Sequence, residues 1–85
     1  MPFELIWTER SKKDLKLIDK GIAARIIERA EMLALQETVF LEKVGGTKYY
    51  KFRVGNYRIL VEKFPATKRL FIARVGHRRN IYKNI

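Results

Sequence analysis

Residues 49–62 alternate between polar and apolar side chains on both sides of a Gly55-Asn56 pair. Glycine at the first of two central positions favours a type II′ turn, so this pattern predicts a β-hairpin with a two-residue loop. In the register that this turn imposes, Arg53 faces Arg58 across the two strands. Because successive side chains point to opposite sides of a strand, the hairpin is expected to have one apolar face and one polar face.

The two faces of the predicted hairpin differ in charge. The apolar face consists of Tyr50, Phe52, Val54, Tyr57, Ile59 and Val61. The polar face consists of Tyr49, Lys51, Arg53, Arg58, Leu60 and Glu62. Like charges directly opposite one another destabilise a strand pair, and Arg53 opposite Arg58, with Lys51 beside them, is such an arrangement. We therefore expect the polar face to bind an anion.

The rest of the chain predicts a strand over residues 3–8, a helix capped by Thr8, a second helix capped by Asp19 and a last strand over residues 70–75. The order strand, helix, helix and then three strands is typical of the α+β class. We expect two helices packed on one face of a largely antiparallel four-stranded sheet. Residues 1–85 are expected to form a single domain.

The net charge of +10, from 19 basic and 9 acidic residues, favours a polyanionic partner, either nucleic acid or an acidic protein. Four basic residues are candidates for RNA phosphate contacts, with a solvated surface as the alternative for the lysines: Lys12, Lys13, Lys16 and Arg79. No apolar run reaches the ~18 residues that span a bilayer, and no signal-peptide pattern is present. We expect a cytoplasmic protein without a membrane partner.

The residue types exclude several kinds of catalytic site. The chain has no cysteine and a single histidine, His77, so thiolate nucleophiles and a two-histidine ribonuclease site are excluded. Its one serine, Ser11, falls on an apolar helix stripe, which argues against a Ser-His-Asp triad. Phosphate-binding glycine motifs are missing, and the acidic residues are scattered. We expect neither a metal nor a cofactor.

A metal-free set of Lys, Arg, His and Tyr side chains can still cleave RNA, because the 2′-hydroxyl is a built-in nucleophile. Arginine forks bind phosphate in a bidentate manner, and preorganised positive charge stabilises the transition state. A lysine crowded by arginines, such as Lys51, is expected to have a lowered pKa and to act as a general base. Tyr82 offers a ring on which a base can stack.

Two segments together resemble the RelE/ParE toxin superfamily of type II toxin–antitoxin systems. They read Tyr50-Lys51-Phe52-Arg53-Val54-Gly55-Asn56-Tyr57-Arg58-Ile59 and Val75-Gly76-His77-Arg78-Arg79-Asn80-Ile81-Tyr82. The resemblance covers nearly the whole chain, with both motifs in the right order and spacing. RelE-type members are mRNA interferases that inhibit translation by cutting mRNA in the ribosomal A site. The resemblance implies mRNA, the ribosome and a RelB-like antitoxin as partners, the last in a heterodimer or heterotetramer.

The resemblance also implies roles for single residues. Lys51 matches the general base, and Arg53 matches the basic residue that holds the phosphate. Arg58 matches the arginine that stabilises the transition state. Tyr82 matches the tyrosine that stacks on the substrate base and orients the 2′-hydroxyl.

The general acid and the activity itself remain open at this point. Arg78 resembles the arginine that protonates the leaving 5′-oxygen, while His77 falls where some ribonuclease members use a histidine. Two other functions share this fold: a ParE-like toxin that inhibits DNA gyrase, and a catalytically silent RNA-binding protein. ParE-like members typically lack the full catalytic set, so its presence here favours the endoribonuclease.

Overall fold

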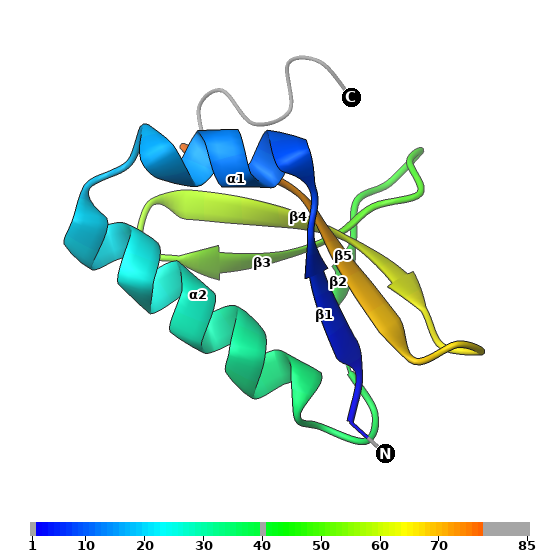
Figure 1. The fold of residues 1–85 in the computed structure, drawn as a ribbon. Coiled ribbons are helices and arrows are strands. Elements are labelled where there is room, and N and C mark those ends of the chain that lie inside the picture. Colours follow the sequence, from blue (N-terminus) through cyan, green and yellow to red (C-terminus); the bar gives the residue numbers. More distant parts are fainter. Residues whose placement is uncertain (1, 40, 78–85) are drawn as a thin grey trace.

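Two helices cover one face of a five-stranded sheet in the computed structural model, which describes residues 2–39 and 41–77 (Figure 1). The elements run in the order β1 (Glu4–Trp7), α1 (Glu9–Lys16), α2 (Lys20–Ala34), β2 (Glu42–Lys43), β3 (Tyr50–Val54), β4 (Tyr57–Phe64) and β5 (Arg69–His77). The predicted α+β class is confirmed. Neither described helix is long and apolar enough to cross a membrane.

The strands lie in the order β1-β5-β4-β3-β2. β1 runs parallel to β5, and the other neighbouring pairs are antiparallel. The sheet has one strand more than the four that the sequence predicts. The additional strand, β2, pairs with β3 through Glu42↔Lys51 and Lys43↔Tyr50. Two residues are too few to show a period-2 pattern, and for this reason the sequence analysis missed β2.

The hairpin of β3 and β4 has the predicted register. Arg53 pairs with Arg58, and Val54 pairs with Tyr57 around the two-residue turn. Gly55 has a φ of +58°, while the only described non-glycine residue with positive φ is Lys68. A positive φ at the first central position alone is the signature of the predicted type II′ turn.

Both helices begin where the sequence predicts. The Thr8 hydroxyl accepts a hydrogen bond from the Ser11 backbone N–H at 3.2 Å and caps α1. The Asp19 carboxylate accepts hydrogen bonds from the backbone N–H groups of Gly21 at 3.0 Å and Ile22 at 3.3 Å, and caps α2. These contacts satisfy amide donors that the first helical turn leaves without partners.

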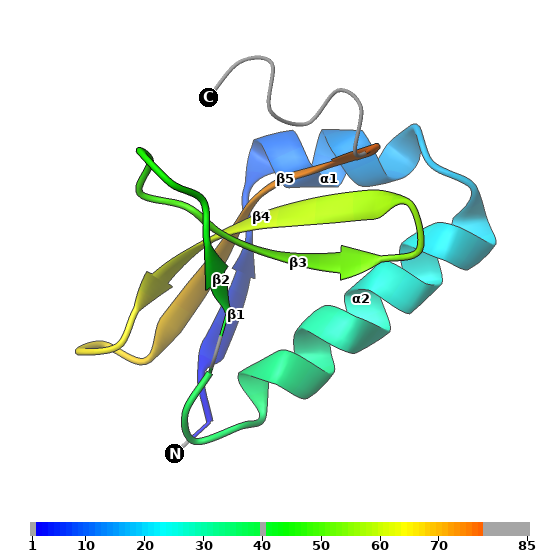
Figure 2. The same ribbon diagram turned by 180° about the vertical axis from the view of Figure 1, so that it is seen from behind.

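The hydrophobic core lies between the two helices and the sheet. Its buried members are Phe3, Ile26, Ala30, Ala34, Val39, Val54, Ile59, Val61, Leu70, Ile72 and Val75. Val54, Ile59 and Val61 come from the apolar face that the hairpin pattern predicts. The polar face of the hairpin is therefore turned away from the helices. Figure 2 shows the ribbon from behind, with β2 in front of β1.

A β-bulge interrupts the pairing of β4 with β5. Leu60 pairs with Arg74, but the next residue, Val61, pairs with Ile72, so Ala73 is left between the two pairs. A bulge increases the local twist of a strand and re-aims the residues that follow it. The second half of β5 consequently diverges from the direction of its first half.

Helix α1 holds this second half of β5 in place. Thr8 Oγ1 donates a hydrogen bond to the carbonyl of Ile72 at 2.8 Å. The Asp14 carboxylate accepts one hydrogen bond from the Val75 backbone N–H at 2.9 Å and another from Arg74 Nε at 3.0 Å. A partly buried carboxylate thus takes the place of a neighbouring strand beyond the end of β1.

Candidate functional site

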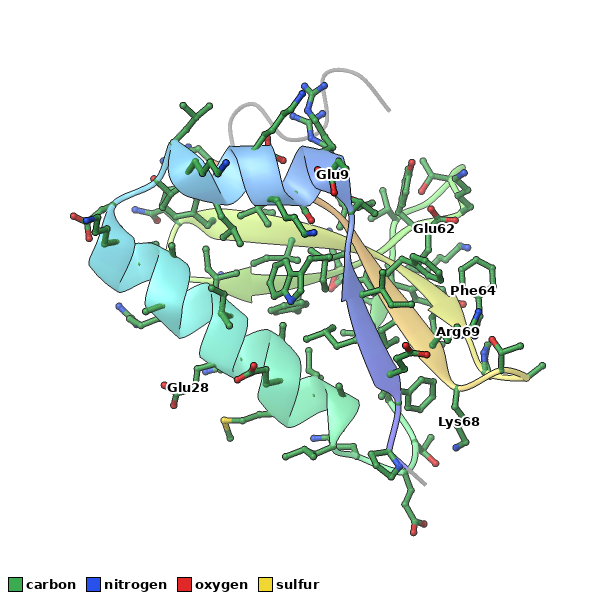
Figure 3. The ribbon with its side chains drawn as sticks, in the orientation of Figure 1. Glu9, Glu28, Glu62, Phe64, Lys68 and Arg69 are labelled. Carbon is green, nitrogen blue, oxygen red and sulfur yellow. The ribbon has the colours of Figure 1, made fainter. Side chains whose placement is uncertain are left out.

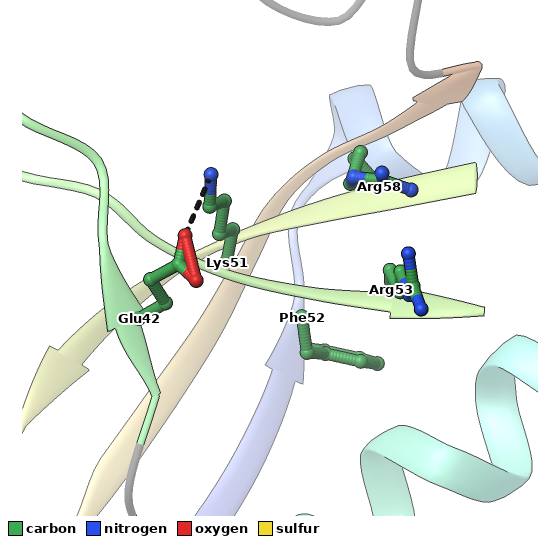
Figure 4. Close-up of a pocket in the computed structure, with 5 residues that line it drawn as sticks. All are labelled: Glu42, Lys51, Phe52, Arg53 and Arg58. Atoms are coloured by element: carbon green, nitrogen blue, oxygen red, sulfur yellow. Dashed lines mark ion pairs between the residues drawn. The ribbon is translucent and has the colours of Figure 1, made fainter. Parts of the chain in front are cut away.

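Three basic side chains of the β3–β4 hairpin line a pocket at the sheet surface (Figure 4). The pocket has a volume of ≈ 290 Å³ and is lined by Glu42, Lys51, Phe52, Arg53 and Arg58. This volume is at the lower end of the range of about 300–1,000 Å³ for small-molecule sites. The predicted cluster of Lys51, Arg53 and Arg58 is therefore brought together in space.

Lys51 forms an ion pair with Glu42 of the neighbouring strand β2. Its Nζ lies 2.9 Å from Glu42 Oε1, and the dashed line in Figure 4 marks this contact. The Lys51 side chain is 28% exposed and that of Glu42 is 72% exposed. The hydrogen bond and the charge of Lys51, and to a smaller extent the charge of Arg58, lower the pKa of Glu42. Glu42 is ionised at neutral pH.

Sequence reasoning missed Glu42, and only a weak signal was available. Glu42 and Lys43 form a strand too short to predict, and the Gly45-Gly46 loop separates them from their partners on β3. Once strand β2 is known, the register Glu42↔Lys51 places an acid directly opposite the expected general base. Opposite charges in such a cross-strand pair stabilise a sheet.

Arg53 and Arg58 face each other without a carboxylate between them. Neither has an ion-pair partner in residues 2–39 and 41–77. Nη1 of Arg58 is buried and has no hydrogen-bond partner within the same residues. A buried donor without an acceptor costs about 1–3 kcal/mol. The pair can satisfy this donor by binding an anion such as a phosphate, for which the guanidinium fork is well shaped.

A second pocket of ≈ 370 Å³ adjoins the first and shares Glu42, Lys51 and Phe52 with it. Its remaining lining residues are Arg29, Met32, Leu33, Gln36 and Leu41. The apolar members among these come from α2 and the segment before β2. The basic pocket is therefore continuous with a more apolar hollow that extends toward α2.

The sheet surface also carries aromatic side chains at the β4–β5 turn. Phe64, which is 43% exposed, packs its ring edge-on against Phe71 with 5.4 Å between the ring centroids. Arg69 Nε lies 3.3 Å from the Glu4 carboxylate. Phe64 ends β4 and Arg69 begins β5, and both lie at the end of this strand pair that is far from α2 (Figure 3).

The other predicted site residues lie apart from the basic pocket or outside the described residues. The His77 ring packs edge-on against Tyr57, with 5.7 Å between centroids, and His77 is paired with Tyr57 across β4 and β5. Tyr57 packs against the core, so His77 is not brought to the side of Lys51. The proposed RNA-contacting residues Lys12, Lys13 and Lys16 are exposed on α1. Three further predictions fall on residues outside the described ranges: Arg78, Arg79 and Tyr82.

Metal ligands are not gathered anywhere in the part of the chain that the structure describes. No three His, Asp or Glu side chains come close enough together there to hold an ion. The chemistry open to the pocket is that of its cations: binding an anion, stabilising negative charge and, for a neutral lysine, accepting a proton.

Comparisons with known proteins agree with the observed fold. The family model described as "ParE toxin of type II toxin-antitoxin system, parDE" matches residues 5–82. A chain of the RelB–RelE antitoxin–toxin complex from Methanococcus jannaschii is 30% identical with a TM-score of 0.74, over 94% of this chain and 98% of that one. A comparison with curated proteins finds no match.

Two further solved structures share the fold at lower identity. A chain of the RelBE2 toxin–antitoxin complex from Mycobacterium tuberculosis has a TM-score of 0.77 at 23% identity, over 94% of this chain and 95% of that one. The RelE toxin of E. coli, a mutant in the free state, has a TM-score of 0.75 at 18% identity, over 91% of this chain and 84% of that one.

Proposed function

The chain belongs to the ParE toxin family, within the RelE/ParE superfamily of type II toxin–antitoxin systems, and from this premise we propose that it is a ribosome-dependent mRNA endoribonuclease. The observation that carries this proposal is the basic pocket. Arg53 and Arg58 face each other there beside a lysine that can serve as a base, and Nη1 of Arg58 is buried without a hydrogen-bond partner among residues 2–39 and 41–77. An RNA phosphodiester supplies an anion for the two guanidinium groups.

In the proposed reaction Lys51, as the neutral amine, removes the proton from the 2′-hydroxyl. The 2′-oxygen forms a bond to the adjacent phosphorus while the bond from phosphorus to the 5′-oxygen breaks. Arg53 and Arg58 bind the non-bridging oxygens and stabilise the charge that builds up on them. In acyl transfer, one preorganised donor of this kind contributes about 10²–10³ in rate.

The remaining steps of the proposal fall to the last residue of β5 and to residues that follow it in the sequence. Either Arg78 or His77 gives a proton to the leaving 5′-oxygen, and Tyr82 stacks on the base next to the scissile phosphate. His77 packs against Tyr57, so a role as the acid requires its ring to leave that contact. This requirement favours Arg78.

We further propose an antitoxin partner and a cytoplasmic location, where mRNA and ribosomes are found. The similar structures from Methanococcus jannaschii and Mycobacterium tuberculosis are toxin–antitoxin complexes. With a net charge of +10, this chain is electrostatically complementary to an acidic antitoxin segment. Binding of such a segment over Arg53 and Arg58 would satisfy the same donors as RNA does and would block cleavage.

A ParE-like inhibitor of DNA gyrase is the second candidate, because the matching family model is the one described for ParE toxins. The test adds the purified toxin to a translating extract that contains a defined mRNA. The endoribonuclease produces new mRNA 5′ ends at A-site positions, and Lys51→Ala abolishes them. Lys20→Ala, an exposed change at the start of α2, is the control and leaves them in place.

The same extract, together with a DNA supercoiling assay on purified gyrase, separates the alternatives. A gyrase inhibitor leaves the mRNA intact and blocks DNA supercoiling by purified gyrase. A catalytically silent RNA-binding protein produces neither effect. Intact mRNA in the presence of folded toxin and translating ribosomes refutes the proposed activity.

A further inference from the structure

Glu42 is the one charged residue of the basic pocket to which the proposed reaction gives no role. It lies on β2, directly opposite Lys51 in the strand register, and its Oε1 is 2.9 Å from Lys51 Nζ. It also lines both adjoining pockets. The carboxylate therefore stands beside the expected general base at the point where the two pockets meet.

Glu42 is the carboxylate that the described part of the chain brings to Lys51. The other acidic side chain of the hairpin's polar face, Glu62, pairs with Lys48 at 3.7 Å. On the next strand, Arg74 is paired with Asp14. These groups are already neutralised by their own partners, so their effect on Lys51 is small compared with that of a contacting carboxylate.

The charges around Lys51 act on its proton in opposite directions. The nearby cations Arg53 and Arg58 favour the neutral amine, which is the form that accepts a proton. The contacting anion Glu42 favours the protonated ammonium, which cannot act as a base. The lowered pKa of Glu42 is the reciprocal of this effect, since each partner stabilises the charged form of the other.

We propose that Glu42 is a positioning residue that holds Lys51 over the pocket and restrains the loss of its proton, so that removing or displacing this carboxylate accelerates RNA cleavage. The acceleration rests on the proposed endoribonuclease function, whereas the effect on the proton of Lys51 does not. Glu42 thus reduces the fraction of Lys51 that is present as the neutral amine, the form that acts as the general base. An incoming phosphate competes with Glu42 for the same ammonium group.

The test compares Glu42→Gln with Glu9→Gln. Glutamine keeps the size and hydrogen-bonding ability of Glu42 and removes only its charge. Glu9 is the matched control, because it also contacts a lysine (Lys12 Nζ at 3.4 Å) but lies on α1, away from the pocket. The two variants therefore have the same net charge, and each loses the anionic partner of one lysine.

The first measurement follows the titration of Lys51 in the free toxin by NMR of its side-chain ¹³Cε, assigned through the Lys51→Arg variant. In Glu42→Gln the midpoint is expected to fall by about one pH unit, the lower end of the effect of a contacting charge. Glu9→Gln leaves the midpoint unchanged. An unchanged midpoint in Glu42→Gln overturns the inference, whether or not the toxin cleaves RNA.

The second measurement is the pH dependence of mRNA cleavage in the translating extract. The acid limb of the profile for Glu42→Gln is expected to move to lower pH by the same amount, with up to about tenfold faster cleavage below the wild-type midpoint. Slower cleavage, or an acid limb that stays in place, overturns the inference that Glu42 restrains cleavage. A shifted NMR midpoint without cleavage by any variant, wild type included, instead refutes the proposed function and leaves the effect of Glu42 on Lys51 established.

Discussion

Replacing Arg58 with alanine is expected to abolish cleavage and, at the same time, to stabilise the fold. Arg58 lies opposite Arg53, and like charges in that arrangement cost about 0.2–1 kcal/mol. Its Nη1, which is buried and has no hydrogen-bond partner in the described part of the chain, costs about 1–3 kcal/mol more. Against these gains stands the lost packing of the arginine stem, about 0.8 kcal/mol for each buried methylene. We expect a net stabilisation of about 1 kcal/mol.

Urea unfolding of the purified toxin, followed by Trp7 fluorescence and far-UV circular dichroism, measures this stabilisation. In a chain of 85 residues, 1 kcal/mol also corresponds to a rise in Tm of roughly 4–8 °C. The loss of one donor to the transition state is expected to slow cleavage by about 10²–10³-fold. Activity and stability therefore change in opposite directions, as is common for residues retained for function.

Arg69→Ala is the matched control, because it removes the same charge from an arginine that has a carboxylate partner, Glu4, at 3.3 Å. Loss of that exposed pair is expected to leave stability unchanged or to lower it by up to about 1 kcal/mol. If Arg58→Ala is less stable than the wild type, the guanidinium has partners in solution and the anion-site argument fails. If Arg58→Ala cuts mRNA at the wild-type rate, the catalytic assignment is wrong.

Three further perturbations test the fold and the site. Asp14→Ala removes the acceptor of the Val75 N–H and of Arg74 Nε, and is expected to lower the free energy of unfolding by about 2–4 kcal/mol in urea titrations; a loss below 0.5 kcal/mol would show that α1 does not anchor β5. Gly55→Ala puts a Cβ on a residue with φ +58°, where no atom of the described residues lies within 4 Å of it, and is expected to cost about 1–2 kcal/mol from backbone strain alone. Binding of an uncleavable 2′-deoxy RNA analogue through the pocket's three cations should weaken roughly twentyfold between 50 and 200 mM salt, whereas a flat response would mean few phosphate contacts.

The hairpin and the helix starts could be predicted because their signals are local. Gly55 fixes the turn, and the turn fixes the pairing of Arg53 with Arg58. Thr8 and Asp19 cap the helices through residues two or three positions ahead. In each case the residues that decide the structure are neighbours in the sequence, so the pattern contains the necessary information.

The missed features depend on contacts between distant segments. The bulge at Ala73 is held by Thr8 and Asp14, which lie more than 55 positions earlier in the sequence. No local sequence pattern predicts it. Leu60, expected on an open polar face, is fully buried there. The Glu42–Lys51 contact follows from a strand of two residues. The three cations of the pocket could thus be found from the sequence, but Glu42, the anionic partner of Lys51, could not.

The parallel pairing of β1 with β5 determines when the sheet can form during translation. Among the described residues, β1 lies at the edge of the sheet and pairs with β5 alone. Residues 4–7 therefore have none of these strand neighbours until residues 69–72 have left the ribosome. Contacts between such distant segments form late in folding. Native closure of this sheet therefore waits for the synthesis of β5, and a nascent chain that lacks β5 cannot yet present the finished fold to an antitoxin or to RNA.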